Sequence, residues 1–211
     1  MKNSRRTIVV GAMVACLAMI SGTALAAGGN SKVSVKPGTF VGKAGDCGTG
    51  YPAGTKGGVD ANWVAQQGLP DAGNSNHALI LAKNVPTTDC SAAGADVQGV
   101  AGMPATTLGF DYRSDSYCGA GAARFNVVTS DNALHFTGGC LNGTATSAGT
   151  DSQGRSWTRA TFNLQDPTQT FPIAAPGTTL VSVTLIQDEQ GTSILDNINV
   201  NGTFVGKPGN S

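Results

Sequence analysis

Apolar and polar residues alternate in short runs along most of the chain, and clusters of turn-forming residues separate the runs. In the run 106–113, for example, the apolar residues Leu108, Phe110 and Tyr112 occupy every second position. Successive side chains of a β-strand point to opposite faces, so this alternation predicts strands with one buried face. The clearest predicted strands are 60–64, 77–82, 106–113, 124–129, 133–137, 157–164, 179–187 and 193–200.

No stretch of the sequence shows the spacing of an amphipathic helix. The composition agrees with an all-β protein, because Gly contributes 30 residues and Glu189 is the only glutamate among 13 acidic residues. Gly, Asn, Ser and Thr favour turns and strands over helices. No linker divides the mature chain, so we expect residues 27–211 to form one antiparallel β-sandwich domain.

The first 26 residues have the pattern of a secretory signal peptide. Lys2, Arg5 and Arg6 precede an apolar run at 7–20, and a small-residue cleavage motif follows at 24–26. The run is too short for a transmembrane helix, and no later stretch is long enough to span a bilayer. We therefore expect a secreted protein, located in the periplasm or outside the cell.

Cys16 lies inside the apolar run, which raises the alternative of a lipoprotein. Met13 is a poor residue for a lipidation motif, and lipidation at Cys16 would leave an apolar mature terminus, so we do not expect lipidation. Removal of the signal peptide leaves four cysteines, an even number that favours two disulfides with three alternative connectivities in an exported chain.

The spacing of the cysteines favours one of these connectivities. Cys118 and Cys140 lie at similar distances on either side of the predicted turn at 130–132, so they should meet at the open end of a hairpin. This pairing leaves Cys47 with Cys90. Each bridge would stabilise the fold by roughly 3 to 4 kcal/mol through loop closure.

The charge of the mature chain limits its partners. Three of the 13 basic residues belong to the signal peptide, so 10 basic residues remain against 13 acidic ones. Nucleic acids and anionic membrane surfaces require a concentrated basic patch, and we expect neither as a partner. Without any oligomerisation signal in the sequence, we expect a monomer.

Polar residues alternate with the apolar ones in three consecutive predicted strands, and five of them offer planar hydrogen-bonding groups. If the strands are neighbours in one sheet, these five side chains gather on its outer face. Such groups suit the recognition of hydroxyls or a carboxylate. The alternative is a solvated face whose charges pair across strands and contribute little energy. The predicted ligand-binding residues are Asp111, Arg113, Arg124, Asn126 and His135.

Trp157 is a further candidate for this binding face. It alternates with Arg159 and Thr161, on the side of its strand away from Ala160 and Phe162. An exposed tryptophan there would stack on the C–H face of a sugar ring. The alternative is a ring that closes one end of the sandwich.

Two segments resemble known proteins. The ending Leu195-Asp196-Asn197-Ile198, followed by Val200-Asn201-Gly202, is similar to the last strand of jelly-roll carbohydrate-binding modules of exported proteins. The segment 156–162 resembles a middle strand of the same modules. The resemblance implies a jelly-roll topology, glycan binding and a structural calcium ion held by Asp196. The alternative for Asp196 is a carboxylate that accepts hydrogen bonds from backbone amides.

Motifs of catalysis are absent from the sequence: it contains no nucleophile elbow, zinc-protease motif or phosphate-binding loop. Asp111 with Asp115 would be the only closely spaced carboxylate pair for a hydrolase, and Arg113, His135 and Tyr117 the only set for a lyase. We therefore expect an exported non-catalytic β-sandwich that binds a glycan or cell-surface polysaccharide and needs no cofactor. The alternatives are a structural or adhesive extracellular protein and a polysaccharide-acting enzyme.

Overall fold

The computed structural model describes residues 32–71 and 75–206. The predicted signal peptide at 1–26, including Cys16, lies outside the described residues. Among the residues that are described, the secondary structure consists of strands and one 3₁₀ turn. No helix in this part of the chain is long and apolar enough to cross a membrane. The all-β prediction is confirmed.

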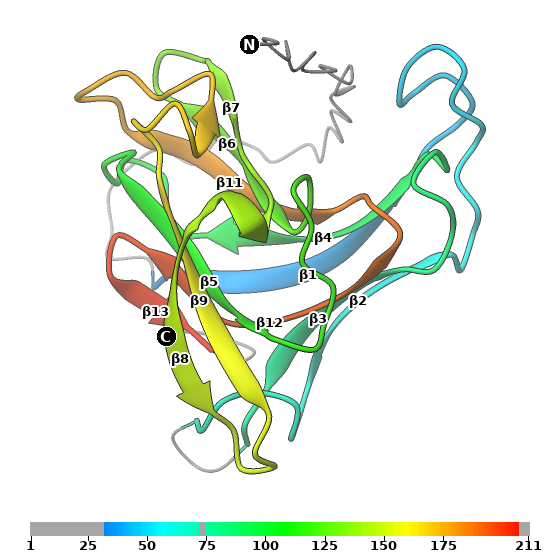
Figure 1. Ribbon diagram of the computed structural model, residues 1–211. Coiled ribbons are helices and arrows are strands. Elements are labelled where there is room, and N and C mark those ends of the chain that lie inside the picture. The colour runs from blue at the N-terminus through cyan, green and yellow to red at the C-terminus, as the bar shows by residue number, and fades with distance from the viewer. Residues whose placement is uncertain (1–31, 72–74, 207–211) are drawn as a thin grey trace, which may run out of the picture.

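Within residues 32–71 and 75–206, thirteen strands form two antiparallel sheets packed face to face (Figure 1). One is a six-stranded sheet with the order β1-β4-β11-β6-β7-β10. Its strands are β1 (Ser34–Val41), β4 (Ser91–Gln98), β11 (Leu180–Gln187), β6 (Arg124–Thr129), β7 (Leu134–Thr137) and β10 (Thr170–Phe171).

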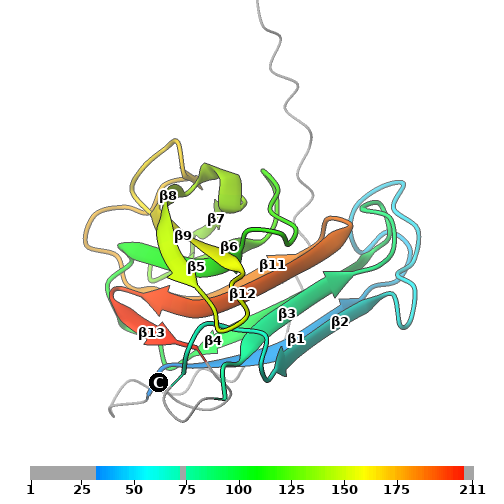
Figure 2. The ribbon, with the colours of Figure 1, turned by 60° about the horizontal axis from the view of Figure 1, so that its bottom comes forward.

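The other is a seven-stranded sheet with the order β2-β3-β12-β5-β9-β8, in which β13 also pairs with β12. Its strands are β2 (Val59–Val64), β3 (Ala78–Lys83), β12 (Gly191–Val200), β5 (Thr107–Arg113), β9 (Ser156–Asn163), β8 (Thr144–Thr150) and β13 (Thr203–Val205). The 3₁₀ turn η1 (Cys140–Asn142) precedes β8. The first strands of the two sheets, β1 and β2, lie against each other (Figure 2).

The core lies between the sheets and is centred on three phenylalanine rings. Phe110 of β5 and Phe162 of β9 come from the seven-stranded sheet, and Phe125 of β6 comes from the six-stranded sheet. Their ring centroids are 5.6 to 6.0 Å apart, a spacing that favours tilted and edge-to-face aromatic contacts. All three rings are fully buried, so the alternation of β5, β6 and β9 predicted their core positions correctly.

Both predicted disulfides are present. Cys118 pairs with Cys140, and Cys47 pairs with Cys90, with Cα–Cα distances of 5.5 and 5.6 Å. Two disulfides are typical of proteins that fold in an oxidising compartment.

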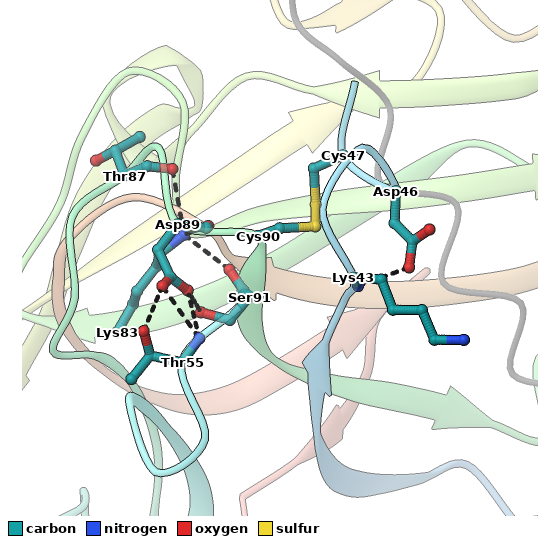
Figure 3. The surroundings of a disulfide bond; sticks show 9 residues. All are labelled: Lys43, Asp46, Cys47, Thr55, Lys83, Thr87, Asp89, Cys90 and Ser91. Atoms are coloured by element: carbon teal, nitrogen blue, oxygen red, sulfur yellow. Dashed lines mark hydrogen bonds between the residues drawn. A yellow bond between two sulfur atoms is a disulfide. The ribbon is translucent and has the colours of Figure 1, made fainter. Parts of the chain in front are cut away.

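The loop before Cys90 is fixed by a buried ion cluster beside the disulfide (Figure 3). The Lys83 ammonium is almost fully buried and donates to the carbonyl oxygens of Thr87, Asp89 and Ser91 at 3.2, 2.7 and 2.7 Å. Burial alone would raise the pKa of Asp89, but hydrogen bonds from Ser91 and Thr55 outweigh it and hold that pKa below its usual value. The cluster satisfies its own charges, so we assign it a structural role.

Candidate ligand-binding groove

The structure separates the five residues predicted to form one polar face. β5 belongs to the seven-stranded sheet, whereas β6 and β7 belong to the six-stranded sheet. Asp111 and Arg113 of β5 therefore lie on the opposite side of the molecule from Arg124 and Asn126 of β6. β6 and β7 are neighbours, as expected, but the expectation that β5 lies beside them was wrong, because alternation identifies strands but not their partners.

Asp111 and Trp157 point away from the core, as their alternation predicts, yet both are covered. Asp111 is 0% exposed and forms a two-point ion pair with Arg159, with N–O distances of 2.7 and 2.8 Å. Trp157 is 1% exposed and packs with Leu69 and Ile194 in a second small cluster. The segment after β2, which includes Leu69, thus closes this outer face, and Trp157 is not a stacking surface for a sugar.

Arg113 holds the same covering segment in place. Its Nε donates to Asp115 at 2.6 Å, and its Nη1 donates to the side-chain oxygen of Gln67 at 3.2 Å. Arg155 donates to that same oxygen at 2.9 Å. Both arginines therefore hold the side chain of Gln67 by hydrogen bonds. The outer face of the seven-stranded sheet is thus largely covered by the protein's own side chains.

His135 lies on the inner side of β7, opposite to the prediction. Its cross-strand partner is the core residue Val127, and it is 1% exposed. The ring nitrogen Nδ1 donates to the carbonyl oxygen of Pro172 at 2.8 Å, and Nε2 lies 2.8 Å from Thr129 Oγ1. These hydrogen bonds satisfy the buried imidazole. Leu134 and Phe136 consequently face outward and are only half-buried.

Arg124 faces outward on β6 but is 7% exposed, because its guanidinium is enclosed by partners. It binds Asp188 through two hydrogen bonds of 2.7 and 2.6 Å and the carbonyl oxygen of Gly121 at 2.8 Å. Its Nε also donates to the side-chain oxygen of Asn126 at 3.2 Å. Arg124 therefore orients Asn126 and has little capacity left for a ligand.

A groove of about 530 Å³ lies on the outer face of the six-stranded sheet. Its floor includes the small residues Ala92 and Gly94 of β4. Small side chains there leave room above the sheet for a bound molecule. The groove is lined from β1, β4, β11, β6 and β7, and its polar and apolar side chains include Lys36, Phe40, Asp96, Asn126, Val128, Leu134, Val181, Thr184 and Ile186.

Four polar residues cross the groove in a single line, which we call the polar row: Lys36, Asp96, Thr184 and Asn126. Each is the direct cross-strand partner of the next, from β1 through β4 and β11 to β6. Directly paired residues lie on the same face of a sheet. The row therefore presents hydrogen-bonding groups at regular intervals of one strand spacing, about 4.8 Å.

The groups of the polar row retain hydrogen-bonding capacity. Thr184 Oγ1 donates to Asp96 Oδ1 at 3.2 Å, which leaves the other carboxylate oxygen of Asp96 as an acceptor. Asn126 accepts from Arg124, and its amide nitrogen donates to no other group in the described chain. Lys36 is exposed and forms no salt bridge with the described acidic residues. The row thus offers donors and acceptors with one positive and one negative charge.

Asp196 was predicted to hold calcium, and the structure places it in a buried turn. Its carboxylate is 1% exposed and accepts from the backbone amides of Leu69 at 2.7 Å and Asn197 at 2.6 Å. Burial, opposed by the two amide hydrogen bonds and assisted by the charges of Asp71 and Asp111, raises the pKa of Asp196 to about 8. The carboxyl group is thus mostly protonated at neutral pH in the absence of a cation.

Three side-chain oxygens converge near Asp196. A Cβ added at Gly206 would lie 2.9 Å from Asp196 Oδ1, 3.0 Å from Asn197 Oδ1 and 3.3 Å from Asp71 Oδ1. Calcium takes six to eight oxygen ligands. Within the described ranges, no group of three or more His, Cys, Asp or Glu side chains has the arrangement of a metal site. A calcium ion at this position would find three side-chain oxygens, fewer than the six to eight ligands it requires.

Comparison with models of protein families, with curated proteins and with solved structures finds no match for this chain. Sequence reasoning identified one of its polar groups, Asn126, and missed Lys36, Asp96 and Thr184. The strand that carries Thr184 was predicted, but β1 and β4 were not among the clearest predicted strands, so nothing in the sequence linked the three residues.

Proposed function

We propose that this protein is an exported, non-catalytic β-sandwich that binds a neutral polysaccharide chain in the groove of its six-stranded sheet. The polar row carries the proposal, because it combines evenly spaced hydrogen-bonding groups with apolar neighbours in a ligand-sized depression. Sugar rings have the same mixed character, with hydroxyls at the ring edge and C–H groups on the ring face. The sequence resemblance to jelly-roll carbohydrate-binding modules supports the same ligand class.

The charges of the groove favour a neutral glycan over a polyanionic one. Lys36 and Asp96 are the charged residues that line it, and their charges cancel. A repeating uronate or sulfate chain would need a surplus of cationic groups. Among the described residues, Asp96 is also the only carboxylate of the lining, whereas glycoside hydrolysis uses two carboxyl groups. Binding without cleavage is therefore the activity that the groove supports best.

The two disulfides support export, because such bridges persist in oxidising compartments. A neutral polysaccharide outside the cell, either in a cell wall or in the surroundings, is then the natural partner. The protein would act as a monomer whose groove recognises an internal stretch of the chain, since a groove is open along its length.

A glycan array probed with residues 27–211 tests the proposal, followed by calorimetric titration of each neutral glycan that binds. Replacing Asn126 by alanine removes one donor of the polar row and should weaken binding by roughly 5- to 150-fold, the cost of about 1 to 3 kcal/mol for one hydrogen bond. Asn62→Ala is the matched control, because Asn62 is an exposed asparagine on β2 of the other sheet.

Three results would count against the proposal. Absence of binding to every glycan would favour a structural or adhesive protein. Equal losses in Asn126→Ala and Asn62→Ala would remove the groove as the site. Release of reducing sugar ends during incubation with a polysaccharide would show an enzyme.

A further inference from the structure

The line of cross-strand partners that contains the polar row continues beyond the groove through two phenylalanines. Asn126 of β6 pairs with Phe136 of β7, and Phe136 pairs with Phe171 of β10, the edge strand. Both rings therefore lie on the same outer face as the groove. One line of cross-strand partners thus runs from a charged residue at β1, through hydrogen-bonding side chains, to two aromatic rings at the opposite edge of the sheet.

Phe171 is unusual among the described residues because it is 78% exposed. Its two neighbours in sequence are both anchored. Thr170 is buried and its hydroxyl donates to the carbonyl oxygen of Asn163 at 3.1 Å, while the carbonyl oxygen of Pro172 accepts from the buried His135 at 2.8 Å. The backbone at Phe171 is thereby fixed, and the ring is held in solvent on a rigid support.

A rigid, exposed aromatic ring at the end of a ligand groove has the properties of a binding residue. It loses little conformational entropy when a ligand covers it, and it offers apolar area that water otherwise contacts. A solvated polar residue would serve the fold equally well at this position, because the side chain of Phe171 supports no described core contact. The fold alone therefore does not account for Phe171.

We infer that Phe136 and Phe171 form an aromatic platform on which a further sugar ring of the bound polysaccharide stacks. The inference rests on the proposed function and extends it, since the platform continues the polar row without a break. Hydroxyls would bind to the polar row, and the C–H face of the next ring would cover the phenylalanines. The chain would then lie across the strands rather than along them.

This geometry sets a minimum length for full binding. Five strand spacings separate β1 from β10, so the line of partners spans about 24 Å at about 4.8 Å per spacing. A disaccharide cannot reach both ends of such a line, whereas an oligosaccharide of five or six sugars can. Affinity should therefore rise with chain length until the ligand covers the platform.

The test compares wild type and Phe171→Ala in titrations with starch-derived and cellulose-derived oligosaccharides of two to seven glucose units, together with size series of any glycan that the array identifies. For the long members, the variant should lose about 2- to 10-fold in affinity, the range of one aromatic contact. For the short members bound in the groove, the variant should match wild type. Phe171→Tyr keeps a ring and should restore the length dependence.

Leu141→Ala is the matched control, because Leu141 is a comparably exposed apolar residue in η1. Circular dichroism and thermal melting of each variant confirm that the fold is intact. If Asn126→Ala weakens binding while Phe171→Ala binds every length as wild type does, the platform is refuted and the groove stands. If wild type binds no oligosaccharide of any length, both the platform and the proposed function fail.

Two other outcomes would also overturn the platform. An equal loss in Leu141→Ala would show a non-specific effect of removing apolar surface. Sedimentation that shows a wild-type dimer, lost in Phe171→Ala, would assign the exposed ring to a second copy of the chain.

Discussion

Raising the pH from 5 to 9 should destabilise the protein through one buried carboxyl group. Asp196 has a pKa raised to about 8, mainly by burial and secondarily by the nearby charges of Asp71 and Asp111. In the unfolded chain an aspartate has a pKa of about 3.9. Between these values the folded protein holds a proton that the unfolded chain has released, so the free energy of unfolding falls as the pH rises and levels off above about pH 8.

The size of the effect follows from proton linkage. Each pH unit inside this window costs about 1.4 kcal/mol, so the interval from pH 5 to pH 8 amounts to about 4 kcal/mol at most. Native domains are typically stable by about 5 to 15 kcal/mol, and the loss would be a large part of that total. The hydrogen bonds from the amides of Leu69 and Asn197 to the carboxylate reduce the effect but do not reverse its sign.

Urea denaturation in the presence of a chelator, carried out from pH 5 to pH 9, measures this effect in wild type and Asp196→Asn. The difference between the two stability curves removes every titration that they share. At pH 5 the variant should be less stable by about 1 to 3 kcal/mol, because an amide has one acceptor oxygen for two backbone donors. That deficit should shrink or reverse by pH 9, and a constant difference across the range would refute the buried, protonated Asp196.

Two further predictions use the same assays. Calcium at Asp196 would stabilise the ionised carboxylate, so calcium should raise Tm more at pH 9 than at pH 5, and identical melting curves in calcium and in chelator would exclude it. Arg124→Ala and His135→Ala, which the sequence alone placed on a tolerant outer face, should each cost about 2 to 4 kcal/mol, because they leave Asp188 or the partners of the imidazole without a hydrogen bond. Phe125→Ala, at about 3 to 5 kcal/mol, is the core reference, and losses under 0.5 kcal/mol in the two polar variants would contradict the contacts described.

The sequence predicted the strands far better than their arrangement. All eight clearly alternating runs are strands, and the cysteine spacing predicted both disulfides. These features depend on local geometry, namely side-chain period and the distance of two cysteines from one turn. Sheet membership depends on long-range pairing, which is why β5 was grouped with β6 and β7 although it lies in the other sheet.

The groove was missed because it is built over two strands with weak signals. β1 carries Pro37 and Gly38, and β4 consists mainly of small residues. At Gly94 in β4 a Cβ would lie 2.7 Å from the carbonyl oxygen of Leu185, so the close approach of neighbouring strands requires glycine there. The small residues that form the groove therefore also leave β1 and β4 without the alternation of bulky apolar residues from which strands were predicted.

The buried face of β7 was also predicted wrongly. Period-2 alternation gave two choices for β7, and hydrophobicity favoured Leu134 and Phe136 as the buried pair. The protein instead buries His135 and Thr137, whose hydrogen bonds satisfy their polar groups, and leaves the apolar pair half-exposed. Local rules of burial are most often broken where a surface serves a function. The inversion therefore draws attention to the same surface as the polar row.

The contrast between the two outer faces supports the proposal that a ligand binds on the six-stranded sheet. On the seven-stranded sheet, Asp111 is paired, Trp157 is covered and Gln67 accepts from two arginines, so a ligand would have to displace contacts that the fold already makes. On the six-stranded sheet, the polar row and Phe171 keep donors, acceptors and apolar area in contact with water. A ligand bound there would displace only water. For this reason, substitutions on the seven-stranded face should change stability, whereas substitutions along the polar row should change affinity.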